Sequence, residues 1–337
     1  MPALTERNQV GKREDLADII SMIDAKETPL YSMAPKGEIP TNTLVEWQVD
    51  QYYDPVITGV IDGEDVTSFD NEAANRVRMR GRVQKFRQSF GVSDFAENVS
   101  DVAGVGKKGE MNRSAAKALV QLKRSIEARA CSDQDSQPDS GTQPYQFRGL
   151  GLWINSSAQT DLPVDSRYLT PSGSIQGGTS FATNVTDALI QNVLTSIYLQ
   201  TGQVKDLTVL CGAQFKRGVT SLSLYQSGGS TPSTLRMFQQ SGTAKEIVST
   251  VDVYHGDFGT IRLVPTVWNA FDSGKNSATS QLRAYVLDFT DVEISFARLP
   301  RIMPLEDRGG GPRSFCDAIG ILKVFNPLSL GKFNYTS

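Results

Sequence analysis

The chain has 337 residues, of which 39% are hydrophobic and 21% are charged, and its formal net charge at pH 7 is -3. These proportions are typical of folded proteins with a sizeable core and exclude a disordered chain. The near-neutral charge argues against a dedicated DNA-binding domain, although a local basic face is compatible with it. The first residues lack the apolar core of a signal peptide, and no segment has the roughly 20 continuous apolar residues that span a bilayer.

Residues 15–27 predict a short helix, because their apolar side chains recur at helical spacing. These side chains are Leu16, Ile19, Ile20 and Ile23. Pro29 is expected to end the helix, since its ring disfavours a helical conformation at Thr28. The apolar face has little before it to pack on, so we expect it to contact the rest of the domain or another subunit.

Residues 43–53 and 76–92 predict the two strands of a hairpin, joined by a polar, acidic segment. Apolar residues alternate with polar ones in both strands, and the second strand carries an arginine row: Arg76, Arg78, Arg80 and Arg82. The apolar phase shifts beyond Gln84, which indicates a bulge or bend. A two-stranded ribbon is marginally stable in water, so this hairpin needs a surface to lie on. Trp47, on the apolar face of the first strand, is a candidate contact residue.

Residues 110–131 show the clearest helical pattern, with an apolar stripe that includes Ala118, Leu122 and Ile126. Residues 132–180 are rich in small and polar residues and predict a surface loop around one apolar island, residues 150–154. A second compact region follows. It has predicted helices at 186–200 and 213–221 and predicted strands at 207–211, 247–254, 260–264 and 283–289. The end of the chain has another predicted strand at 318–325. We therefore expect an α+β fold.

Gly104, Gly106 and Gly109 match the spacing of a dinucleotide-binding turn before a helix. That function also needs a second parallel strand after the helix, whereas here a polar loop follows. We therefore interpret the glycines as a hinge and keep a dinucleotide-binding oxidoreductase as a remote alternative. The glycine-rich segment 308–313 is interpreted as a mobile turn, with an anion site as the alternative.

His255 is the only histidine, and no nucleophile motif lies near it, so we interpret it as structural. Acidic residues show no calcium-loop spacing. The three cysteines, Cys131, Cys211 and Cys316, are far apart and predict reduced thiols in a cytosolic assembly environment. We expect no catalytic residue, cofactor or metal.

The arginine row has two interpretations. It is either a solvated strand face or an inter-subunit contact with an acidic surface on a neighbour. Direct genome binding has less support, because neither interleaved aromatic residues nor a basic overall charge accompanies the row.

Several segments, in their order and spacing, resemble the major capsid proteins of tailed bacteriophages, which have the Hong Kong ninety-seven-type fold. The resemblance covers nearly the whole chain. Within the family, the segments resemble a podophage-associated branch. The segments that carry it are 14–20 with 28–30, 45–50, 87–93, 122–127, 257–265 and 323–327. No single segment is decisive.

The resemblance implies an N-terminal arm (1–40), an extended hairpin loop (41–92), a peripheral domain (93–183) with a spine helix at 110–131, an axial domain (184–304) and a C-terminal return strand to the peripheral domain (305–337). It implies pentamers and hexamers of an icosahedral virion shell, assembled in the host cytoplasm around double-stranded DNA. Ile19, Ile23, Trp47 and the arginine row become candidate inter-subunit contacts, and the three glycines a candidate hinge.

Implied partners are other copies of the chain, a portal, possible decoration proteins and DNA held by non-specific contact, without a membrane. Some relatives crosslink through a lysine in the extended loop, but no lysine lies between Thr41 and Gln84, so we expect no covalent crosslink. Since the chain starts at Met1, we expect a separate scaffolding protein. The alternatives are another virion component or an encapsulin-like compartment shell.

Overall fold

The computed structural model describes residues 24–67, 69, 71, 73–99, 108–178, 185–222, 238–241, 244–247, 251–269 and 282–335. Most of the predicted helix at 15–27 therefore lies outside the described residues, and residues 24–27 are not helical. The expectation that Pro29 ends a helix is wrong, because Pro29 begins α1 (Pro29–Met33). Proline suits this first helical position, where its missing N–H would have no intrahelical partner.

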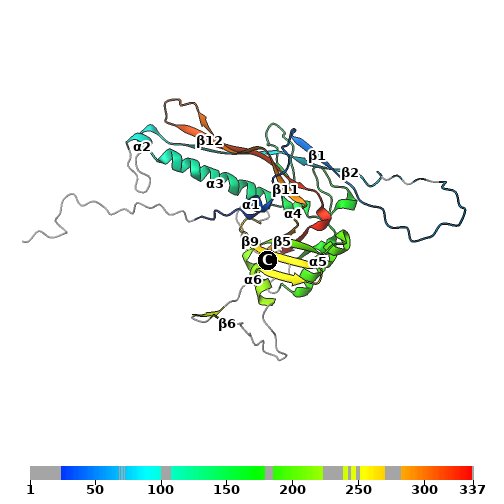
Figure 1. Cartoon of the computed structure of the whole chain (residues 1–337). Helices are drawn as coiled ribbons and strands as arrows, with labels where there is room; N and C mark the ends of the chain where they lie inside the picture. The colour runs from blue at the N-terminus through cyan, green and yellow to red at the C-terminus, as the bar shows by residue number, and fades with distance from the viewer. Residues whose placement is uncertain are drawn as a thin grey trace, which may run out of the picture.

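A three-stranded antiparallel sheet lies against α3 (Glu110–Ala130), the longest helix among the described residues (Figure 1). Its strands are β11 (Val292–Leu305), β12 (Arg313–Val324) and β3 (Gln84–Gly91), with β12 in the middle. The predicted stripe of α3 is confirmed, since Ala118, Leu122 and Ile126 are buried. These side chains share a core with Phe86 and other residues of the sheet. A short helix, α2 (Asp94–Asn98), lies between β3 and α3 in the sequence.

A six-stranded mixed sheet forms the second half of the molecule, in the order β4-β13-β10-β5-β9-β8. Its strands are β4 (Ile175–Gly178), β5 (Lys205–Cys211), β8 (Val253–Gly256), β9 (Gly259–Pro265), β10 (Ala284–Leu287) and β13 (Gly331–Tyr335). The helices α5 (Asp187–Thr201) and α6 (Ala213–Leu222) share a core with one face. Leu210, Tyr285 and Leu287, from the other face, belong to the core of α3, so the two halves are packed together. A separate hairpin joins β6 (Phe238–Ser241) to β7 (Ala244–Ile247).

The segment 132–180 is mostly loop, as predicted, but much of it is buried instead of lying at the surface. Its apolar island forms α4 (Leu150–Trp153), where Leu150 and Trp153 are 0% and 1% exposed. The polar composition misled the prediction because buried charges are paired here: the Arg148 Nε donates to the Asp135 Oδ1 at 2.8 Å. Burying an unpaired charge would be costly, whereas a paired one is tolerated inside a core.

Two strand predictions need correction. The single strand expected at 76–92 is two, β2 (Val77–Arg82) and β3, and the break at Val83 accounts for the phase shift seen in the sequence. The strand expected at 247–254 is divided between β7 and β8, with residues 248–250 outside the described part.

Sheet membership departs from the expected boundaries. β11 pairs with β12 in the three-stranded sheet, although residues 292–304 were expected with the second compact region. Conversely, β4 and β13 pair in parallel at the edge of the six-stranded sheet. The chain therefore crosses between its halves more often than the predicted boundaries allow, because strands distant in sequence complete both sheets.

Candidate functional site

The base of the hairpin is anchored in the core of its own chain. β1 (Leu44–Val49) pairs antiparallel with β2, which places Trp47 opposite Met79. The Trp47 ring lies 5.7 Å from Trp153 and 6.2 Å from Phe325, and its Nε1 donates to the Val324 carbonyl at 3.1 Å. Trp47 thus fixes the direction in which the hairpin leaves the body.

The hairpin tip, residues 50–76, projects from the body as a long loop on the right of Figure 1. Its large apolar side chains are 75% to 98% exposed in seven cases: Tyr52, Val56, Ile57, Val60, Ile61, Val66 and Phe69. From Asp50 to Asn75 the sequence has seven acidic residues and no basic one. An exposed set of apolar residues of this size marks an interaction surface in soluble proteins.

The arginine row divides between two environments. Arg82 forms an ion pair with Asp161 at 2.8 Å, and this hydrogen bond lowers the pKa of the Asp161 carboxyl. Arg76 pairs with Asp50 at 3.1 Å across the hairpin, and Arg78 lies 3.6 Å from a Glu46 oxygen. Arg82 therefore braces the hairpin base, whereas Arg76 and Arg78 stay exposed.

A basic face lies on the outer side of the three-stranded sheet, opposite α3. Asp317 of β12 is buried, and three cations lie within 4 Å of it: Arg298 at 2.8 Å, Arg301 at 3.5 Å and Lys85 at 3.9 Å. Arg87 is the register partner of Asp317 and lies over the Phe315 ring. We call Lys85, Arg87, Arg298 and Arg301 the basic sheet face; one carboxylate cannot neutralise four cations.

The histidine and the three cysteines weighed in the sequence analysis lie in the following surroundings. His255 lies exposed on β8, 3.3 Å from the Thr260 hydroxyl. Burial raises the pKa of the Cys131 thiol well above its ordinary value and that of Cys211 to about 12. All three cysteines are buried and unbridged. Over the described ranges, no cluster of His, Cys, Asp and Glu is arranged to hold a metal ion, and no helix is both long and apolar enough to cross a membrane.

The glycine motifs are placed only in part. Gly104 and Gly106 lie outside the described residues, and Gly109 is the N-cap of α3. The strand before them, β3, belongs to an antiparallel sheet, which is not the parallel context that a dinucleotide site requires. The segment 308–313 is the turn between β11 and β12, where Asp307 accepts hydrogen bonds from the amides of Gly309 and Gly311.

A comparison with protein families identifies the family to which a chain with this hairpin and these two sheets belongs. A family model described as SU10 major capsid protein matches residues 3–332. The chain belongs to this family. As a major capsid protein, it forms the shell of a virion, and its role there is structural.

Solved structures show that this capsid protein has the Hong Kong ninety-seven-type fold of tailed-phage capsids. The cyanophage A-1(L) capsid asymmetric unit is similar with a TM-score of 0.62 and 15% identity, over 99% of each chain. A structure from Mycobacterium phage Bobi has a TM-score of 0.59 and 11% identity, over 97% of this chain and 96% of that one. The cyanophage P-SCSP1u capsid has a TM-score of 0.58 and 10% identity, over 96% of this chain and 93% of that one. No curated protein matches the capsid protein in sequence.

The predicted family and fold are thereby confirmed, while the podophage-associated branch stays a prediction. Among the predicted contact residues of the capsid protein, Ile19 and Ile23 lie outside the described residues. Trp47 and Arg82 are engaged within their own chain, and Arg76, Arg78 and Arg80 lie together on the hairpin.

Sequence reasoning missed the basic sheet face. Its residues come from β3 and β11, more than 200 positions apart in the chain. Only the strand pairing through β12 brings them together around Asp317. Predicting β11 would have placed Arg298 and Arg301 in a sheet, but no strand was predicted at 292–305.

Proposed function

We propose that this capsid protein assembles into pentamers and hexamers of an icosahedral shell around double-stranded DNA in the host cytoplasm. Portal, scaffolding and possible decoration proteins are its proposed partners, as the family resemblance implies. The half with α3 and the three-stranded sheet is the proposed peripheral domain, and the half with the six-stranded sheet is the proposed axial domain. The observation that carries the proposal is the hairpin tip, which exposes seven large apolar side chains and packs little against its own chain.

The proposed binding surface for the tip is the basic sheet face of a neighbouring copy. The tip has acidic residues and no basic ones, and the basic sheet face has four cations around one buried carboxylate. Apolar side chains lie near both surfaces: Leu299 and Leu305 of β11 are 63% and 48% exposed. Opposite charges would set the orientation of the contact, and apolar burial would stabilise it. Each such contact can be weak, because a closed shell repeats it many times.

Charge exchange between the two surfaces tests the proposal. Arg87→Glu reverses one charge of the basic sheet face and leaves the three cations on Asp317 in place. Glu64→Lys reverses one charge at the tip. We expect each variant to lower the yield of closed particles severalfold in negative-stain microscopy, and the two together to restore part of it. Particle yield should also fall with added salt, because exposed ion pairs are screened.

Lys117→Glu is the matched control, since Lys117 is exposed on α3, away from the basic sheet face. If the double variant assembled worse than either single variant, the pairing of tip and basic sheet face would be wrong. Assembly into hollow particles would still support the shell function itself, so the two claims are separable.

A further inference from the structure

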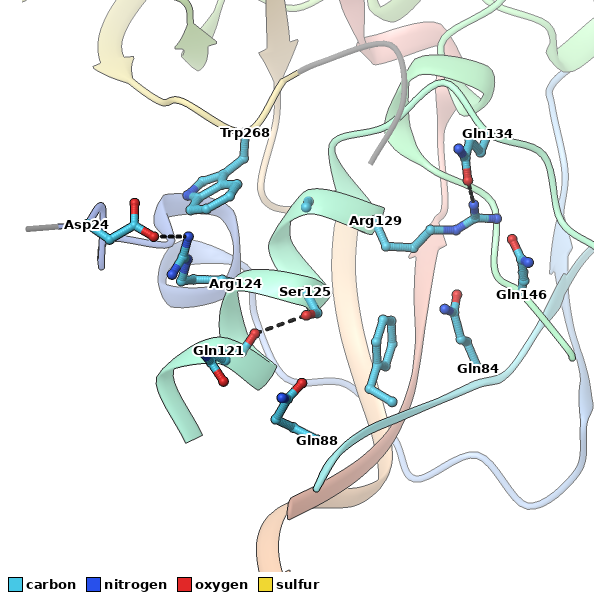
Figure 2. A pocket seen from close by; sticks show the side chains of 12 residues that line it. Asp24, Gln84, Gln88, Gln121, Arg124, Ser125, Arg129, Gln134, Gln146 and Trp268 are labelled. Atoms are coloured by element: carbon cyan, nitrogen blue, oxygen red, sulfur yellow. Dashed lines mark hydrogen bonds and ion pairs between the residues drawn. The ribbon is translucent and has the colours of Figure 1, made fainter. Parts of the chain in front are cut away.

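The first described residues of the chain are held against the spine helix by an ion pair. The Asp24 carboxylate lies 2.7 Å from the Arg124 guanidinium in the middle of α3. Figure 2 shows the two side chains facing each other beside a groove of about 760 Å³, which α3 and β3 line together. The Arg124 side chain is 21% exposed and the Asp24 side chain is 41% exposed, so the ion pair is shielded from solvent mainly on the Arg124 side.

A second contact comes from the other half of the molecule. Trp268 follows β9 of the six-stranded sheet, and its ring lies over the Arg124 guanidinium at 5.1 Å (Figure 2). The Trp268 Nε1 donates to the Glu27 carbonyl at 2.8 Å. Trp268 is 3% exposed, so the indole joins α3, the six-stranded sheet and the N-terminal segment at one buried point.

A third contact lies one turn further along α3. Glu127 is fully buried, and its two carboxylate oxygens accept hydrogen bonds from the Leu30 and Tyr31 amides at 2.8 and 2.6 Å. These amides are orphan donors of the first turn of α1, which a helix cannot satisfy from within. A side chain of α3 therefore caps α1 from outside, and Leu30 is inserted fully into the core.

We propose that residues 24–34 form a latch that docks as one unit and requires both α3 and the segment after β9 in their present relative position. We call these residues the arm latch. Arg124 and Glu127 hold it from α3, and Trp268 holds it from the six-stranded half while its ring positions Arg124. A shift of one half against the other separates the indole from Glu27 and Arg124. The arm latch then opens, and residues 24–34 separate from α3.

The test measures amide hydrogen exchange at Leu30 and Tyr31 in the purified full-length protein, in Trp268→Phe, Arg124→Met and the double variant. Trp268→Phe keeps an aromatic ring and removes the Nε1–H donor. Arg124→Met keeps the aliphatic stem and removes the ion pair. We expect exchange at both amides to be about tenfold faster in each single variant, and no faster still in the double variant, because the indole positions Arg124 and the loss of either residue removes the same coupled contact.

Two controls keep the result specific. Arg113→Met removes an ion pair with Glu110 in the first turn of α3 and should leave both amides unchanged. Arg124→Lys retains the charge and should keep exchange close to that of the wild type, with the amides of Val193 and Leu194 in α5 as an internal reference for global unfolding. Rate increases that multiply in the double variant would show independent contacts and overturn the latch, as would unchanged exchange in Trp268→Phe.

Discussion

The buried Glu127 carboxyl makes the stability of this capsid protein depend on pH. Burial raises the pKa of Glu127 to about 7, and the hydrogen bonds from the Tyr31 and Leu30 amides and the nearby charge of Lys36 oppose that rise only in part. A carboxyl whose pKa is higher in the folded state than in the unfolded chain binds more protons when folded between the two values. Its stabilising contribution is therefore complete below about pH 4.5 and is lost as the pH rises through about 7.

Glu127→Gln should remove this pH dependence, because the amide is a neutral side chain of the same shape. Near pH 5 the variant should be less stable than the wild type, because glutamine has one acceptor oxygen for the two amides that donate to Glu127. Between pH 5 and pH 8 the wild type should lose up to about 3 kcal/mol of stability relative to the variant. Urea unfolding of unassembled protein at the two pH values measures the difference. A constant difference across this range would contradict the assigned pKa.

At the scale of one element, α4 is tightly confined. The Lys332 ammonium donates a hydrogen bond to the Gly151 carbonyl at 2.6 Å. A methyl group on Gly151 would overlap the Asp133 carboxylate, which pairs with the fully buried Arg283 at 2.5 Å. Position 151 therefore requires glycine, because the Asp133 carboxylate leaves no room for a Cβ atom.

Gly151→Ala should therefore displace Asp133 and break its ion pair with the buried Arg283. Breaking a buried ion pair from one side typically destabilises a protein by about 3–5 kcal/mol, so we expect a loss of that order in urea unfolding. Gly59→Ala is the matched control, because open space surrounds Gly59 at the hairpin tip, and its effect should stay within about 0.5 kcal/mol. Equal midpoints for the two variants would show that α4 can adjust.

The elements that follow a simple local period could be predicted, and the others could not. α3, α5, β5 and β9 matched closely, since one face of each is apolar at regular spacing. β11 was missed because its pairing shifts twice between Phe296 and Arg301 and its second half is exposed, which erases the alternation. In the candidate site, the hairpin and its acidic tip were predictable, whereas the basic sheet face depends on tertiary pairing and left no local pattern.

At the scale of the whole molecule, assembled shells should contain no covalent bond between copies through the hairpin. An isopeptide crosslink from this loop needs a lysine amine, and residues 41–84 contain none. Mature particles boiled in detergent under reducing conditions should run as a single band at the 36.8 kDa monomer on a denaturing gel. A ladder of dimers, trimers and larger species would contradict this prediction.

The three buried thiols can report local opening of the protein through their reaction with an alkylating reagent. Cys131 lies after α3, Cys211 ends β5 and Cys316 lies within β12. Cys131 and Cys316 belong to the core around α3 and Cys211 to that of the six-stranded sheet, and burial raises the pKa of all three. An alkylating reagent attacks the thiolate of an accessible cysteine, so it modifies each site only while its surroundings are open. The order in which the three become alkylated on gentle heating therefore reports which part of the unmutated protein loosens first.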